Sequence, residues 1–266
     1  MQLLGGAAEV QGLRDGDEVA QLAQVQIHEA SRSGDVLRVS QPLKEVLDTS
    51  SSRWHRQLRT PKPSGEHMNY AIIGFGTIGQ ALAKAFARSG IQVSVATTRA
   101  PESLASAAAA IGPELVPTDL AQALTADIIF LAVPFGSHPD VARALPSWTG
   151  KTIVDVTNAY GVSPEQLGDK SSAQVVAQAF TGAKLMKGFN HLVAGVLEQD
   201  PAVQGGRRVV FLASDDEGAA AQVGALAEAL GFAPVDLGGL AEGGLLVQAS
   251  GTTWGQLIFK DLVTFG

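Results

Sequence analysis

The chain has 266 residues, of which 45% are hydrophobic and 17% are charged, and its formal net charge is −7. This composition predicts one sizeable hydrophobic core rather than a disordered chain. The acidic balance argues against a nucleic-acid partner, because nucleic-acid-binding proteins normally carry a basic face. The sequence contains no cysteine, which excludes disulfides, thiolate metal sites and cysteine nucleophiles. Its five histidines are scattered and form no HxxxH pair, so we expect no dedicated metal site.

No apolar run approaches the roughly 20 residues that are needed to cross a bilayer. The longest apolar stretches, such as residues 128–133, are short and bounded by polar segments. The N-terminus carries no early positive charge, and its short apolar start leads into the charged residues 14–18, unlike a signal peptide. We therefore expect a cytoplasmic protein with no membrane partner.

The first 67 residues differ in composition from the rest of the chain. Residues 17–30 fit a helix with a loose apolar stripe, and the clusters of Ser, Thr, Arg and Pro after them end in the linker-like residues 59–65. A strand pattern begins two residues after Met68, as in many nucleotide-binding domains. We interpret residues 1–67 as an N-terminal extension, partly helical or flexible, and Met68 as a true or alternative start. A regulatory or dimerising arm is the less favoured alternative.

Strand and helix patterns alternate from Met68 onward, which is typical of a parallel sheet with crossover helices. The expected strands are residues 70–73, 92–96, 115–116, 127–133, 152–156, 184–187, 208–213 and 233–236. The expected helices are residues 78–89, an alanine-rich stretch after Pro101, and residues 139–145, 173–179 and 219–230. We therefore predict an α/β fold, namely a Rossmann-type, doubly wound parallel sheet with a small C-terminal α/β extension.

A glycine-rich turn separates the first predicted strand from the first predicted helix. Its residues are Gly74, Phe75, Gly76, Thr77, Ile78 and Gly79. In the GxGxxG pattern the first glycine permits the tight turn, the second lets a pyrophosphate approach the backbone, and the third lets helix and strand pack closely. The helix N-terminus adds free N–H groups and a partial positive charge. The position between strand and helix makes this pattern a strong indication of a dinucleotide site.

The end of the second predicted strand distinguishes NADP from NAD. NAD-specific folds usually place an acidic residue there to bond the ribose hydroxyls, whereas this chain has Thr97, Thr98 and Arg99. Two hydroxyls and a guanidinium suit a 2′-phosphate, which an acidic side chain would repel. The residues therefore favour NADP(H) over NAD(H). The alternative is that Arg99 is an ordinary exposed residue at the start of a helix.

Two further strand ends lie on the same predicted edge of the sheet, where such folds bind ligands. Val133, Pro134 and Phe135 end the fourth strand, and Phe135 either flanks a cofactor ring or caps the core. Thr157 and Asn158 end the fifth strand and are candidates to bond the nicotinamide ribose or carboxamide. Asn158 has the alternative of stabilising a turn.

Short motifs beyond the turn follow one another in a specific order and spacing. They are residues 73–79 (IGFGTIG), 97–99 (TTR), 133–135 (VPF), 155–158 (DVTN), 187–192 (KGFNHL), 205–208 (GGRR) and 235–240 (VDLGGL). Through them the chain from Met68 to Gly266 resembles the NADPH-dependent reductases of the deazaflavin coenzyme F420. It is equally similar to their flavin-reductase relatives, including the cytosolic domain of membrane metalloreductases.

The resemblance implies direct hydride exchange between NADPH and a small-molecule redox acceptor with a tricyclic ring, either coenzyme F420 or FMN/FAD. It divides the chain into an NADP-binding Rossmann domain, residues 68–182, and an acceptor-binding and dimerisation portion, residues 183–266. Asn190 and His191 are the candidate catalytic residues, which would bond the acceptor ring, and Lys187 would balance negative charge. A packed His191 and an exposed Lys187 are the alternatives.

Other functions compete with this interpretation. The β-hydroxyacid and imine reductases need a long all-helical second domain, whereas strands are predicted near Val209 and Val235, so we reject that class. A non-catalytic NADP-binding or sensing module stays open, because no convincing proton donor stands out. The glycine-rich apolar tail, residues 237–265 with Trp254, would leave an exposed patch unless it is covered, so we expect a homodimer.

Overall fold

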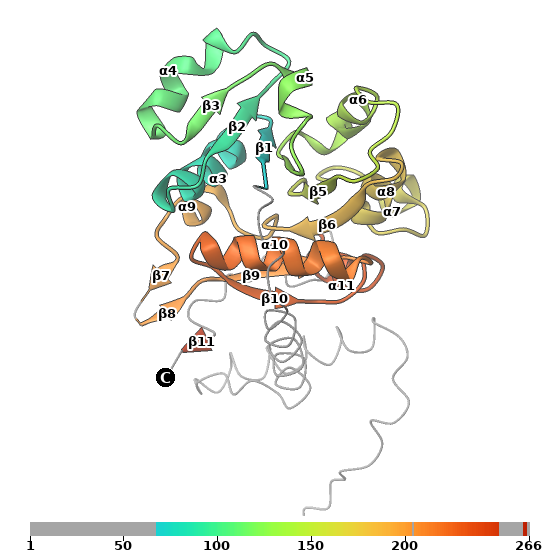
Figure 1. Cartoon of the computed structure of the whole chain (residues 1–266). Helices are drawn as coiled ribbons and strands as arrows, with labels where there is room; N and C mark the ends of the chain where they lie inside the picture. The colour runs from blue at the N-terminus through green and yellow to red at the C-terminus, as the bar shows by residue number, and fades with distance from the viewer. Residues whose placement is uncertain (1–67, 204, 250–262, 265–266) are drawn as a thin grey trace, which may run out of the picture. The chain divides into compact units, whose positions relative to one another are not determined.

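The computed structural model describes residues 68–203, 205–249 and 263–264 (Figure 1). These residues belong to one compact unit of the chain. The predicted helix at residues 17–30 and Trp254 lie outside the described residues. Within those ranges no helix is both long enough and apolar enough to span a membrane.

An eight-stranded sheet forms the centre of the fold, in the order β10-β9-β6-β5-β4-β1-β2-β3. Six neighbouring strands are parallel, from β3 at one edge to β6. They are β1 (Tyr70–Ile73), β2 (Val93–Ala96), β3 (Leu115–Pro117), β4 (Ile128–Leu131), β5 (Thr152–Asp155) and β6 (Lys184–Gly188). The order β3-β2-β1-β4-β5-β6 is that of a Rossmann fold, which confirms the predicted fold class.

The strands of the predicted C-terminal portion continue this same sheet. β9 (Val209–Ala213) pairs antiparallel with β6, and β10 (Ala233–Asp236) pairs parallel with β9. The predicted boundary after residue 182 therefore falls inside one continuous sheet. Because β9 runs in the opposite direction, its amino end lies at the edge where β6 ends. A small three-stranded sheet comprises β7 (Ala202–Val203), β8 (Gly206–Arg207) and β11 (Val263–Thr264).

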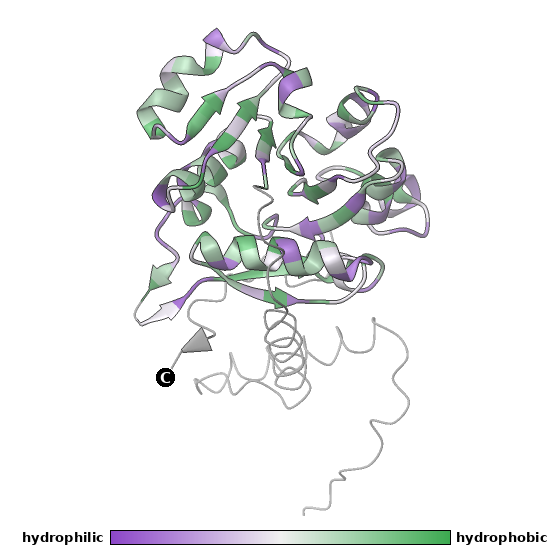
Figure 2. Ribbon diagram, viewed as in Figure 1, coloured by the Kyte–Doolittle hydropathy of each residue, from purple (hydrophilic) through white to green (hydrophobic). Residues whose placement is uncertain are grey.

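Helices cover both faces of the main sheet, as a doubly wound fold requires. One face packs against α3 (Thr77–Arg88), α4 (Glu102–Ile111) and α10 (Glu217–Ala229). The other packs against α5 (Leu120–Ala123), α6 (His138–Ala142) and α8 (Ser172–Ala179). The shorter helices are α7 (Pro164–Leu167), α9 (Ala194–Leu197), α11 (Gly243–Leu246) and the 3-10 turn η1 (Phe135–Ser137). Figure 2 shows strongly hydrophobic strands between helices of mixed character.

Four aromatic rings run through the core on the α3 and α10 side. Phe86 of α3 contacts Phe130 of β4, Phe130 contacts Phe189, and Phe189 contacts Phe232, with ring centroids 5.5, 5.6 and 5.8 Å apart. All four are fully buried. These edge-on contacts connect the first half of the sheet to its antiparallel extension. The end of the predicted helix at residues 78–89 is also confirmed, since α3 ends at Arg88 and Gly90, just past it, has a φ of +64°.

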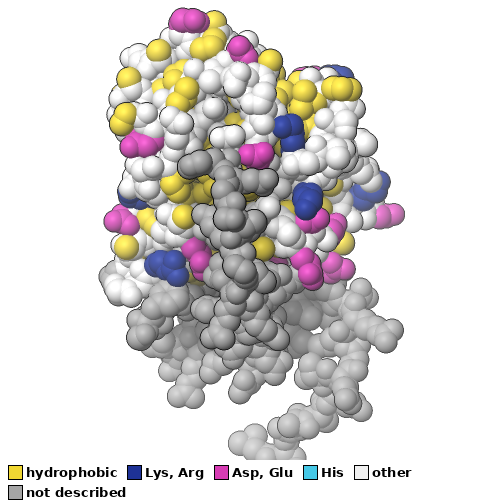
Figure 3. Space-filling model, viewed as in Figure 1, with side chains coloured by type: hydrophobic (Ala, Val, Ile, Leu, Met, Phe, Trp, Pro, Cys, Tyr) yellow, Lys and Arg dark blue, Asp and Glu magenta, His cyan; other side chains and the backbone are white. Residues whose placement is uncertain are grey.

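The visible surface carries both signs of charge. On the face shown in Figure 3, where grey atoms do not cover it, acidic and basic side chains are interspersed among uncharged ones. This one face does not test the expectation of no nucleic-acid partner, which stays a prediction.

The glycines of the first turn allow a test of the packing between α3 and β1. A Cβ atom at Gly79 would lie 2.0 Å from the Gly74 carbonyl oxygen, whereas one at Gly76 would meet nothing within 4 Å. We expect Gly79→Ala to lower the free energy of unfolding by about 1–3 kcal/mol, because backbone must shift to admit the methyl group. Gly76→Ala is the matched control and should leave the denaturation midpoint unchanged. Equal midpoints for the two variants would contradict this account.

Candidate functional site

The carboxyl ends of the parallel strands meet at one edge of the sheet, and this edge is where doubly wound folds bind nucleotides. The loops that leave β1, β2, β4, β5 and β6 there carry the residues that the sequence singled out. The structure therefore brings the predicted site residues to a common edge, although their exposure differs widely.

The glycine turn after β1 has the shape that a bound pyrophosphate needs. Gly74 has a φ of +100°, and a Cβ atom there would lie 2.2 Å from the Ala132 carbonyl oxygen. Gly76 is exposed and its surroundings are open. It also begins α3 with no side-chain cap and no acidic residue in the first turn, so the first N–H groups of the helix are available to an anion. The turn thus fits a dinucleotide phosphate.

The side chains of this turn divide between the core and the surface. Phe75 is buried in the main core, so any contact with a cofactor would come from its backbone. Thr77 is exposed and Ile78 is half-buried. Gln80 Nε2 donates to the Phe75 carbonyl oxygen at 3.1 Å, which holds the turn against the first turn of α3.

The residues after β2 lie open to solvent. Thr97 is half-buried, and Thr98 and Arg99 are exposed. The Arg99 backbone N–H donates to Thr97 Oγ1 at 3.1 Å, which folds this short segment over the strand end. The described salt bridges do not include Arg99, so its guanidinium is available for a phosphate.

The segment after β4 places an aromatic ring near the same edge. Val133 and Phe135 are half-buried and Pro134 is exposed. The Phe135 carbonyl oxygen accepts a hydrogen bond from His138 Nδ1 at 2.5 Å, and the two rings lie 4.9 Å apart. Phe135 also packs against the core on the α8 side, so both predicted roles, ring neighbour and core cap, agree with its position.

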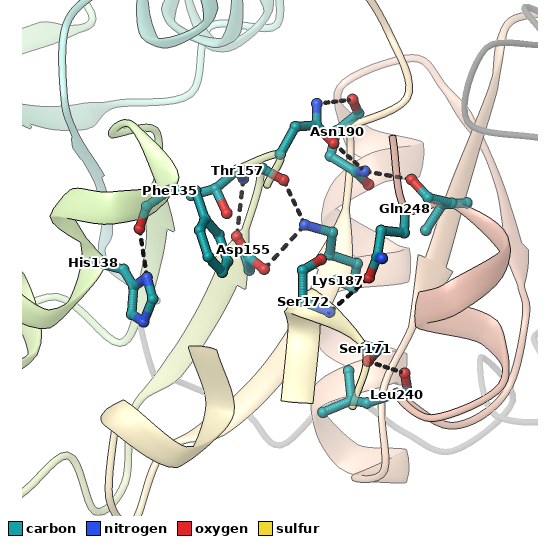
Figure 4. Close-up of polar contacts among 12 residues, drawn as sticks. Phe135, His138, Asp155, Thr157, Ser171, Ser172, Lys187, Asn190, Leu240 and Gln248 are labelled. Atoms are coloured by element: carbon teal, nitrogen blue, oxygen red, sulfur yellow. Dashed lines mark hydrogen bonds and ion pairs between the residues drawn. The ribbon is translucent and has the colours of Figure 1, made fainter. Parts of the chain in front are cut away.

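A buried ion pair joins the ends of β5 and β6 (Figure 4). Lys187 Nζ lies 3.0 Å from Asp155 Oδ2 and donates to the Thr157 carbonyl oxygen at 2.5 Å. Asp155 Oδ1 accepts the Thr157 N–H at 2.9 Å. Both charged side chains are completely buried. The direct ligand contact suggested for Lys187 would require its ammonium to leave this pair, and the exposed alternative is wrong.

Two asparagines connect the β5 and β6 loops to the C-terminal segment (Figure 4). Asn158 Nδ2 donates to the Asn190 carbonyl oxygen at 2.9 Å. Asn190 Nδ2 in turn donates to Asn158 Oδ1 at 3.0 Å and to the Val247 carbonyl oxygen at 2.7 Å. Among the described residues, Asn190 Oδ1 and Thr157 Oγ1 are buried and have no hydrogen-bond partner. Buried polar atoms usually have partners, so these two, which follow β5 and β6 at the nucleotide edge, are candidates to bond a ligand.

The chain is strained where it enters this network. Phe189 has a φ of +61°, and among the described residues it is the one non-glycine residue with a positive φ. Such a conformation costs about 1–3 kcal/mol and tends to occur at functional sites. Here it turns the chain sharply after β6, so that the Phe189 ring enters the core while Asn190 bonds Asn158 and Val247.

His191 lies in the interior, against β9. Its ring is 4.9 Å from that of Phe211, and Nε2 lies 3.4 Å from the Val209 carbonyl oxygen. Burial lowers the pKa of His191 from 6.5 to about 4, despite the opposing effect of the Val209 contact. The imidazole is therefore neutral near pH 7. This position favours the packed alternative, and a direct contact with an acceptor stays a prediction.

The sequence interpretation missed several polar residues around this site. Asp155 is part of the motif at residues 155–158, but the sequence analysis predicted no role for it. The contacts to the C-terminal segment were not predicted either. Ser171 Oγ donates to the Leu240 carbonyl oxygen at 2.8 Å, and the Ser172 N–H donates to Gln248 Oε1 at 2.6 Å. A usable signal for Asp155 did exist, since Asp155 and Lys187 have opposite charges and each follows two apolar residues near the end of a predicted strand.

Comparison with known proteins places this architecture among oxidoreductases. A sequence model of the family described as "NADP oxidoreductase coenzyme F420-dependent" matches residues 69–159. The rat (Rattus norvegicus) metalloreductase STEAP3 is 30% identical over 173 residues, which are 64% of this chain and 34% of the relative. The chain thus spans about a third of the length of the curated relatives it matches.

Two solved structures share the fold over most of their own length. Hypothetical protein SMa0349 of Sinorhizobium meliloti is 41% identical, with a TM-score of 0.66, covering 69% of this chain and 91% of that one. A proposed F420-dependent NADP reductase from Arthrobacter sp. FB24 is 26% identical, with a TM-score of 0.57, covering 67% and 89%.

The buried imidazole predicts an acid-sensitive fold. The folded-state pKa of His191, about 4, lies below its unfolded value of 6.5, so the unfolded chain binds more protons between these pH values. His191 therefore contributes stability above pH 6.5 that is progressively lost as the pH falls towards 4. Between pH 7 and pH 5 we expect a loss of about 2 kcal/mol in wild-type protein from this group. Urea denaturation of His191→Leu should show a pH dependence that is weaker by this amount, and parallel curves for the two proteins would refute the assignment.

Proposed function

Because this chain belongs to the family of coenzyme F420-dependent NADP oxidoreductases, we propose that it transfers a hydride between NADP(H) and a deazaflavin or flavin ring. The observation that carries the proposal is the open Gly76 turn at the uncapped start of α3, on the same sheet edge as Arg99. The turn would hold the pyrophosphate, while Thr97, Thr98 and Arg99 would hold the 2′-phosphate.

When bound, NADPH supplies the hydride from its nicotinamide ring. The residues of this chain would bind the two rings, hold them in position for the transfer and exclude water. The described part of the site offers no accessible histidine for proton transfer at the strand ends, since His138 and His191 are both buried. Reduction of the acceptor ring also consumes a proton, which solvent can deliver to an edge of the ring.

Exposed apolar side chains support the proposed position of the acceptor. Among the described residues, the exposed large hydrophobic side chains are Tyr160, Val193 and Leu245. They belong to the three segments that Asn158, Asn190 and Val247 hold together by hydrogen bonds. Exposed apolar side chains on three linked segments support a binding surface here, and a flat tricyclic ring is a suitable ligand for it. We assign Asn190 Oδ1, which is buried and unpartnered, to the polar edge of that ring.

The proposal is tested by NADPH oxidation, followed as the loss of nicotinamide absorbance. Coenzyme F420, FMN, FAD and riboflavin are each offered as acceptor, with NADH as the alternative donor. Rapid turnover with one acceptor, and slower turnover with NADH, would support the proposal and identify the acceptor. Tight NADPH binding without reduction of any acceptor would instead favour an NADP-binding or sensing module.

Arg99→Ala tests the cofactor half of the site. Loss of a charged hydrogen-bonding partner should raise the Kd for NADPH roughly ten- to a hundredfold, because each such interaction is worth about 1.5–3 kcal/mol. The Kd for NADH should hardly change, since NADH lacks the 2′-phosphate. Isothermal titration calorimetry measures both constants, and an equal loss for the two cofactors would remove Arg99 from the phosphate site.

Tyr160→Ala tests the acceptor half. The exposed ring should contribute stacking area to the acceptor, so its loss should raise the acceptor KM roughly three- to tenfold. The Kd for NADPH should stay at its wild-type value. Arg99→Ala is the reciprocal control, because it should affect NADPH and leave the acceptor KM unchanged. If Tyr160→Ala raises the Kd for NADPH and leaves the acceptor KM unchanged, the acceptor binds elsewhere.

A further inference from the structure

We propose that Asp155 and Lys187 are positioning residues, which hold Thr157 so that its hydroxyl recognises the nicotinamide riboside half of the cofactor. This inference rests on the proposed function, because it assumes that the sheet edge binds NADP(H). It assigns a role to a buried charge pair that the sequence interpretation did not explain.

The ion pair bonds the backbone just beyond the end of β5, where the hydrogen bonds of the sheet stop. β5 ends at Asp155, and Asp155 faces Lys187 in the register of the two parallel strands. Two residues later, Thr157 has left the strand, yet both of its backbone groups are bonded. Its N–H donates to Asp155 Oδ1 at 2.9 Å, and its carbonyl oxygen accepts from Lys187 Nζ at 2.5 Å. One ion pair thus holds Thr157 at both backbone groups.

Stability alone is a weak explanation for this pair. Both side chains are completely buried, and removing two charges from water costs several kcal/mol for each ion. Apolar residues of similar volume often stabilise a protein as well as or better than a buried ion pair. The charges therefore make most sense through what they hold in place, which is the chain segment that leaves β5 at the ligand edge.

The held residue presents an unused polar group. Thr157 Oγ1 is buried and has no hydrogen-bond partner, although its own backbone is fully bonded. The next residue, Asn158, connects to Asn190 and so to the proposed acceptor side. A hydroxyl between the phosphate turn and the acceptor segments along this edge suits the ribose hydroxyls or carboxamide of the cofactor. It can both donate and accept, as those groups require.

The test compares the binding of NADP⁺ with that of 2′-phospho-ADP, which lacks the whole nicotinamide riboside. Thr157→Val removes the hydroxyl and keeps the shape of the side chain. It should lower the affinity for NADP⁺ about tenfold, as expected for the loss of one hydrogen bond. The affinity for the fragment without the nicotinamide riboside should stay unchanged. The matched control is Thr118→Val, which removes another buried, unpartnered hydroxyl after β3. The control should leave the affinity for both ligands unchanged.

The positioning role is tested with two double variants. Asp155→Leu with Lys187→Met replaces the pair by apolar side chains of similar size, and Asp155→Asn with Lys187→Gln keeps polar groups without charge. Each variant that folds, judged by its denaturation midpoint, should lose affinity for NADP⁺ selectively, as Thr157→Val does. A folded double variant with wild-type affinity would overturn the positioning role.

Failure of this inference is distinguishable from failure of the proposed function. If the wild-type protein binds neither ligand in calorimetry, the proposed function is wrong. If the wild-type protein binds both ligands and Thr157→Val shows no selective loss, only the role of Thr157 and its ion pair is overturned.

Discussion

The close approach of α3 to β1 is the constraint on which the nucleotide edge depends. Helix and strand can meet there only because Gly79 has no side chain, since a Cβ atom would lie 2.0 Å from the Gly74 carbonyl oxygen. A Cβ atom at Gly74 would lie 2.2 Å from the Ala132 carbonyl oxygen, so this glycine lets the turn pack against the end of β4. The contact between α3 and β1 places the start of α3 at the edge of the sheet. The first N–H groups of the helix and the exposed Gly76 are therefore available to a ligand there. The proposed 2′-phosphate segment after β2 and the strand ends of β4 and β5 are arranged around this point.

The second half of the edge is organised by buried polar groups instead of glycine. The Asp155–Lys187 pair holds the segment after β5, and the strained Phe189 turns the segment after β6 towards it. Asn190 then connects both segments to Val247 in the C-terminal part of the described chain. A chain of hydrogen bonds therefore runs from the proposed cofactor side to the proposed acceptor side. This continuity is what a direct exchange between two stacked rings needs, because both rings must be held in one geometry.

Much of the fold follows from local patterns. The apolar run that became β4 and the glycine that ends α3 were recognisable because each depends on neighbouring residues alone. Thr98 and Arg99 are exposed, which agrees both with the predicted phosphate site and with the alternative of an ordinary surface arginine. The predicted roles of Lys187 and His191 were harder to judge, because residue type does not show which way a side chain points. Both side chains are directed into the interior, where Lys187 pairs with a residue 32 positions away and His191 packs on β9.

Local patterns were enough to predict the strand–helix alternation, the glycine turn and the absence of an acidic residue after the second strand. These features depend on periodicity and spacing over a few neighbouring residues. No local pattern shows that β9 reverses direction beside β6, that Asp155 meets Lys187, or that Asn190 meets Asn158, and these features emerge from the folded chain. The reason is physical: such contacts depend on the register between strands and on which face each side chain occupies, and these are settled by packing of the whole core.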